Sequence, residues 1–92
     1  MILRMLNKEG HTTYILNLDR FMDFYVDESK RVHGGPTVVG WHPNGSSEPT
    51  ENIWSFTTKE EADKFLDFIG ECFIQNKRCI NLYMDTDSYN AQ

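Results

Sequence analysis

The residues of this chain that could do chemistry are three histidines and two cysteines, at His11, His33, His42, Cys72 and Cys79. Their spacing does not match a zinc site, since the chain has neither a C-x-x-C nor an H-x-x-x-H motif. A cysteine nucleophile at Cys79 would need its pKa lowered by Lys77 and Arg78, but this cationic pair is more typical of a helix C-terminus. The pattern therefore predicts no metal ligand, no cofactor and no catalytic residue.

Other short motifs also fall short of a catalytic or ligand-binding pattern. Gly34-Gly35-Pro36 precedes a strand rather than a helix, so it does not form a phosphate-binding loop. Ser46-Ser47 lacks the flanking glycines of a nucleophile elbow. Asp85-Thr86-Asp87 begins like a calcium loop but lacks the glycine that the sharp turn requires. We therefore expect a protein that is not an enzyme.

Composition and charge narrow the class of protein further. The chain has 92 residues, a net charge of −5 and 39% hydrophobic residues, which fits one small globular domain. The negative charge argues against a nucleic-acid binder, although tyrosine and tryptophan could stack on bases. No segment has the pattern of a signal peptide or a membrane span. We expect a cytoplasmic protein with a basic or neutral protein partner.

The stretch 53–73 predicts a strand, a turn and one amphipathic helix. Thr58-Lys59-Glu60-Glu61 has the form of a capping box, in which Thr58 binds a free helix amide and Glu61 reaches back to the N–H of Thr58. Apolar residues then recur at helical spacing. They are Ala62, Phe65, Leu66, Ile69, Cys72 and Phe73. We expect a helix over about 58–76 with a single buried stripe.

Runs of β-branched and aromatic residues precede this helix. They lie at 2–6, 12–18, 21–27, 37–41 and 52–56. The predicted fold class is α+β: an antiparallel β-meander of about five strands, with the helix covering one face. A closed barrel is a variant of this arrangement. A further strand over 79–84 could pair with the same sheet or with a neighbouring molecule. We expect one domain over 1–84 and a flexible polar tail over 85–92.

Two tryptophans and the loops beside them are the strongest indication of a binding site. Trp41 precedes the loop 42–50, where a partly exposed indole could anchor a protein partner or simply close the end of the core. The predicted partner-binding residues are Trp41, His42, Asn44, His33 and Trp54. The alternative function is a small-molecule-binding domain with a pocket near the loops 28–36 and 42–50.

The third apolar run and the last one also suggest self-association. Residues 21–27 are apolar on both faces, so this strand is either central in the sheet or in contact with another subunit. The predicted self-association residues are Phe21, Tyr25, Ile80, Leu82 and Met84. Pairing of the segment 80–84 across a two-fold axis would give a homodimer.

The order of these parts resembles that of the small flagellar FlbD family and of short proteins of Gram-positive bacteria and their phages. The matching pieces are Met1-Ile2 with Leu6-Asn7, Leu16-Asn17-Leu18-Asp19 with Phe21, and Phe56-Thr57-Thr58 with Glu60-Glu61-Ala62. This chain differs in its longer loops and in the added segment 80–84. The resemblance implies a small accessory or regulatory protein, and it assigns no catalytic residue.

Overall fold

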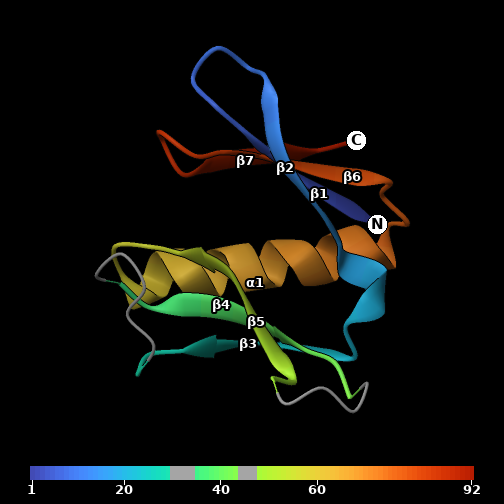
Figure 1. The fold of residues 1–92 in the computed structure, drawn as a ribbon, viewed down its shortest axis with the longest axis vertical. Coiled ribbons are helices and arrows are strands. Elements are labelled where there is room, and N and C mark those ends of the chain that lie inside the picture. Colours follow the sequence, from blue (N-terminus) through green and yellow to red (C-terminus); the bar gives the residue numbers. More distant parts are fainter. Residues whose placement is uncertain (30–34, 44–47) are drawn as a thin grey trace. The chain divides into compact units, whose positions relative to one another are not determined.

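The computed structural model describes residues 1–29, 35–43 and 48–92. Within these ranges the chain forms seven β-strands, one α-helix and one short 3-10 helix (Figure 1). The fold class is α+β, as the sequence predicts. The strands are distributed over two sheets instead of the single meander that the sequence suggests.

The chain divides into two compact units. The terminal unit contains Met1–Asp19 and Glu71–Gln92, and the central unit contains Arg20–Gly70. The sequence predicts one domain over 1–84. The structure instead brings the two ends of the chain together in one unit, because the first strand pairs with a strand that follows the helix.

The terminal unit contains a four-stranded sheet in the order β2-β1-β6-β7. Its strands are β1 (Ile2–Leu6), β2 (Thr12–Asn17), β6 (Cys79–Tyr83) and β7 (Ser88–Ala91). β1 and β2 form an antiparallel hairpin, as the sequence predicts, while β1 and β6 are parallel. Parallel pairing between the two ends of the chain leaves no local turn motif, so the sequence did not reveal it.

Buried aliphatic side chains hold this sheet together. Cross-strand register places Leu3 opposite Leu16 on one side and opposite Ile80 on the other, so these three share a face. All three are buried, with exposed fractions of 4% or less. This face forms the apolar core of the terminal unit.

The prediction of a flexible tail over 85–92 is corrected by β7. Asp87 adopts a left-handed conformation with φ of 57°, which turns the chain back toward β6. The Gln92 amide donates to the Cys79 carbonyl at 2.9 Å, and the Asn81 side chain donates to Asn90 at 2.9 Å. These bonds pair the polar end of the chain with β6, which its composition alone does not indicate.

The central unit contains a three-stranded antiparallel meander, with β4 between β3 and β5 (Figure 1). Its strands are β3 (Asp23–Asp27), β4 (Thr37–Trp41) and β5 (Thr50–Ser55). β3 is therefore an edge strand, so the first of the two predicted alternatives, a central strand, is wrong. A short 3-10 helix, Leu18–Arg20, precedes it.

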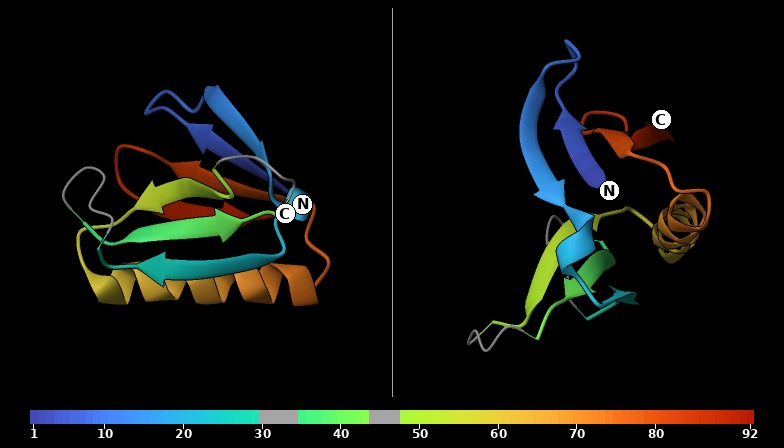
Figure 2. Two further views of the ribbon diagram at one scale, coloured as in Figure 1. Left: turned by 60° about the horizontal axis from the view of Figure 1, so that its bottom comes forward. Right: turned by 90° about the vertical axis from the view of Figure 1, so that its right-hand side faces the viewer.

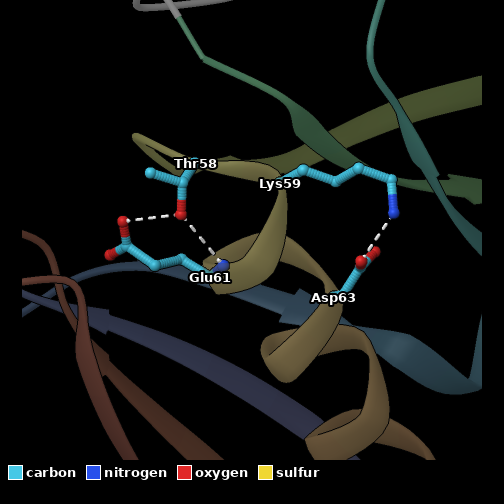
Figure 3. Close-up of polar contacts among 4 residues, drawn as sticks. All are labelled: Thr58, Lys59, Glu61 and Asp63. Carbon is cyan, nitrogen blue, oxygen red and sulfur yellow. Dashed lines mark hydrogen bonds and ion pairs between the residues drawn. The ribbon is translucent and has the colours of Figure 1, made fainter.

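Helix α1 (Lys59–Ile74) begins in the central unit and runs alongside the three-stranded sheet (Figures 1 and 2). Thr58 caps its first turn (Figure 3): the Glu61 amide donates to Thr58 Oγ1 at 3.2 Å. The Glu61 carboxylate accepts a hydrogen bond from the Thr58 hydroxyl at 3.1 Å, where the capping box predicts the backbone N–H as donor. A hydrogen bond from Lys59 to Asp63 at 2.7 Å raises the pKa of Lys59.

The helix ends two residues earlier than predicted, because Asn76 leaves the helical conformation with φ of 56°. The Lys77 amide donates to the Cys72 carbonyl at 2.9 Å, a bond typical of a Schellman C-cap. The predicted apolar stripe is buried at Ala62, Phe65, Ile69 and Cys72. Phe65 lies against Phe56, with ring centroids 5.3 Å apart.

Candidate functional site

The structure places three of the five predicted partner-binding residues in the central unit. Trp41 ends β4, His42 follows it, and Trp54 lies in β5; all three are half-buried. His33 and Asn44 lie outside the described residues. Half of the residues in the loops 28–36 and 42–50, where the alternative pocket is predicted, also lie outside the described residues.

Trp41 and Trp54 point to opposite faces of the three-stranded sheet. Trp54 lies opposite Val38, three residues before Trp41 in β4. Side chains alternate along a strand, so Val38 and Gly40 share one face while Val39 and Trp41 share the other. The predicted site is therefore divided between two faces.

One face carries an acidic aromatic surface, which we define as Asp23, Tyr25 and Trp41. Asp23 lies opposite Trp41, and Tyr25 lies opposite Val39, so all three side chains share this face. Tyr25 is 38% exposed and Asp23 is exposed, while Trp41 is half-buried. Two aromatic rings beside a carboxylate are suited to a lysine or arginine side chain, which both groups attract.

The other face carries a closely packed aromatic cluster around Phe21. Gly40 allows this packing, because a Cβ atom there would lie 2.6 Å from Cδ1 of Phe21. The rings of Phe24 and His42 each have centroids 5.6 Å from that of Phe21. Arg20 lies over the same ring at 5.0 Å from its centroid. This cluster gives β3 and β4 a rigid support.

Two polar groups of this cluster, the Arg20 guanidinium and His42 Nδ1, differ in whether they have a polar partner. Arg20 forms an ion pair with Glu51 of β5. The Nδ1 atom of His42, by contrast, is buried and has no hydrogen-bond partner within the part of the chain that the structure describes. His42 therefore acts here chiefly as a flat ring against Phe21. The sequence predicts His42 as a partner-binding residue, and in the structure its ring packs against Phe21.

The terminal unit corrects the predicted self-association surface. Ile80 and Leu82 are fully buried, and β6 pairs with β1 on one side and β7 on the other. Met84 is half-buried, and its amide donates to the Leu6 carbonyl at 3.0 Å. The segment 80–84 therefore has no edge available to a second copy. Phe21 is also buried, at 8% exposure, whereas Tyr25 is exposed.

A polar row crosses the other face of the four-stranded sheet. Arg4 Nε donates to Asn81 Oδ1 at 2.9 Å, and the Asn81 amide donates to Asn90 at 2.9 Å. Asn81 is only 3% exposed, so its amide is satisfied by these two neighbours. Sequence patterning missed this row because Arg4 and Asn81 are 77 residues apart.

The two cysteines are both free. Burial raises the pKa of the Cys72 thiol above its usual value. Across the described ranges, no three His, Cys, Asp or Glu side chains gather closely enough to hold a metal ion. In the same ranges no helix has the length and apolar character needed to cross a membrane.

Asp23 is the surface residue that the sequence interpretation missed. The alternation of Asp23, Tyr25 and Asp27 could have placed two carboxylates on either side of an aromatic ring. We do not include Asp27 in the acidic aromatic surface, because its carboxylate accepts a hydrogen bond from the Ser29 amide at 2.9 Å.

Comparisons with known proteins give no relative from which a role could be transferred. No protein family matches this chain, and neither a curated protein nor a solved structure matches it significantly.

Proposed function

We propose that this protein is a small, non-enzymatic interaction module that binds a cationic segment of a protein partner through Asp23, Tyr25 and Trp41. The resemblance to the FlbD family adds that the module acts as a regulatory or accessory protein in the bacterial or phage cytoplasm.

The observation that carries this proposal is the shared face of the three side chains at a sheet edge. Asp23 and Tyr25 belong to the edge strand β3, and Trp41 lies in the neighbouring strand β4. Tyrosine and tryptophan are enriched among residues that dominate binding energy. A partner's lysine or arginine would contact both rings and the carboxylate together.

Charge and rigidity further support a basic partner. The chain carries a net charge of −5, which favours encounter with a positively charged surface. The cluster around Phe21 fixes β3 and β4 from the opposite face, so little ordering is needed when a partner binds.

The test compares two tryptophans of the same sheet. Partners are captured from cell lysate with wild-type protein, Trp41→Ala, Trp54→Ala and Asp23→Lys, and then quantified by mass spectrometry. We expect Trp41→Ala and Asp23→Lys to weaken binding of one salt-sensitive partner at least about tenfold. Trp54→Ala is the matched control because Trp54 lies on the opposite face.

Melting temperatures of all four proteins separate loss of binding from loss of folding. If Trp54→Ala and Trp41→Ala have equal melting temperatures and capture equally reduced amounts of the partner, the proposed surface is contradicted. Retention of the partner by a folded Trp41→Ala variant would contradict it as well.

A further inference from the structure

We infer that the edge strand β2 pairs with β2 of a second copy, which joins two four-stranded sheets into one continuous sheet. This inference is independent of the proposed function, because it concerns the terminal unit and a different partner. It also replaces the self-association surface that the sequence predicts.

β2 is an edge of the four-stranded sheet, since its only neighbour in the described part of the chain is β1 (Figure 2). Its six residues, TTYILN, include no charged side chain and no proline. Monomeric proteins usually protect such an edge with a lysine, a proline or a very short strand. β2 has none of these, although a bulge opposite Met5 and Leu6 interrupts its first residues.

The hydrogen-bond pattern shows which backbone groups of β2 point outward. The Leu18 amide donates to the Met1 carbonyl, while the Ile2 amide donates to Arg78 before β6. Bonded and non-bonded pairs alternate in an antiparallel ladder, so Tyr14 and Leu16 bond to β1. The N–H and C=O groups of Ile15 and Asn17 therefore face away from the sheet.

These groups define one symmetric register. A two-fold axis at Ile15 places the two copies of this residue opposite each other, and it brings Asn17 of the second copy beside Thr13, the residue at the bulge. Within the paired strands no like charges meet, because β2 carries no charged side chain. Ile15 is 59% exposed and would be covered by its counterpart.

Charge explains why a second copy would bind at β2 and not at β3. The chain is acidic, so most contacts between two copies bring like charges together. β3 begins with Asp23 and ends with Asp27, and a symmetric pair of these strands would bring carboxylates together. β7 is uncharged but has only four residues. β2 is the longest uncharged edge among the described strands.

Oligomeric state tests this inference directly. The mass of the wild-type protein in solution, measured by sedimentation over a concentration series, should rise from that of a monomer to that of a dimer. Ile15→Lys places two like charges opposite each other and should raise the dissociation constant of the dimer at least about tenfold. Ile74→Lys is the control, because Ile74 is 76% exposed and lies at the end of α1.

Charge rescue separates the proposed pairing from a general loss of fold. An equimolar mixture of the Ile15→Lys and Ile15→Glu variants should recover the dimer that each variant alone lacks. A monomeric wild-type protein at every concentration would overturn the inference. So would an unchanged dimer in Ile15→Lys, or a mixture that stays monomeric.

Cysteine cross-linking tests the register. Paired Cα atoms at Ile15 would lie about 5.5 Å apart, within the range of a disulfide. An Ile15→Cys variant should therefore form a bond between its two copies at position 15, identified by peptide mapping. Tyr14→Cys should not, because its two copies are separated by about two residues along the strands. Equal cross-linking of both variants would contradict the register.

Discussion

The two sheets of this protein differ in how they treat their edges. In the central unit, the edge strand β3 carries Asp23 and Asp27 and presents Tyr25 between them. In the terminal unit, the edge strand β2 carries no charged side chain. Charge protects an edge from pairing with an identical strand. The acidic edge is thus suited to a cationic partner, and the uncharged edge is suited to a second copy.

The sheets also differ in how they accommodate polar groups beneath the surface. The terminal unit satisfies the buried Asn81 through Arg4 and Asn90. The central unit leaves His42 Nδ1 without a hydrogen-bond partner among its described residues. Substitution of Asn81 should therefore lower the free energy of unfolding, whereas substitution of His42 should change it little.

The largest expected effect is on the core of the central unit. Phe65 is fully buried against Phe56, so Phe65→Ala should lower the free energy of unfolding by about 3–5 kcal/mol. Phe73→Ala, on the same helix at 38% exposure, should lower it by less than about 1 kcal/mol. Urea denaturation measures both, and equal losses would contradict the assigned core.

The next largest effect on stability is expected where Phe21 packs on Gly40, on the face opposite the acidic aromatic surface. Gly40→Ala places a methyl group against the Phe21 ring and should cost about 1–3 kcal/mol. In a Phe21→Ala background the same substitution should cost nearly nothing, because the colliding ring is gone. An additive loss in the double variant, measured by denaturation, would show that Phe21 does not pack on Gly40.

A smaller effect distinguishes the polar groups of the two sheets. Asn81→Leu should cost about 1–2 kcal/mol, because it removes the partner of both Arg4 and Asn90. His42→Phe should change stability by no more than about 0.5 kcal/mol, since it keeps the ring against Phe21 and removes an unsatisfied nitrogen.

The acceptor of the Asn81 amide gives a second measure of the same bond. Asn90→Ala leaves the buried Asn81 amide without its acceptor and should cost about 1–2 kcal/mol. The Asn81→Leu and His42→Phe variants are both measured by thermal and urea denaturation. If Asn81→Leu leaves the free energy of unfolding unchanged while His42→Phe lowers it, the proposed contrast between the two sheets is contradicted.

A further, local effect is expected at the helix cap. Thr58→Ala removes the acceptor for the Glu61 amide and should cost about 1 kcal/mol. Thr58→Ser keeps this oxygen and should restore most of the stability. Equal destabilisation by both substitutions would show that the cap hydrogen bond is not the cause.

Local sequence patterns predicted the central unit better than the terminal unit. The helix, its Thr58 cap and the strands of the meander follow from neighbouring residues. The pairing of β1 with β6 does not, because Arg4 and Asn81 are 77 residues apart in the chain. β7 was missed for the same reason, since its polar residues become a strand only when β6 is beside them.

The candidate surface could be predicted only in part. Trp41 is predicted as a partner-binding residue from its type and its place before a loop, whereas Tyr25 is predicted as a self-association residue because its strand is apolar on both faces. That Tyr25 and Trp41 lie on the same face follows only from the register between β3 and β4, which the sequence does not reveal. Trp54 was grouped with Trp41 on composition, and the same kind of register places it on the opposite face.

Hydrogen exchange at single-residue resolution tests the contrast between the two edges most directly. The Ile15 and Asn17 amides point away from the sheet, so they should exchange rapidly in dilute protein and more slowly as the protein concentration rises. Amides of the acidic edge strand β3 should exchange at rates independent of concentration. Concentration-independent exchange at Ile15, or protection that develops along β3 instead, would contradict the account.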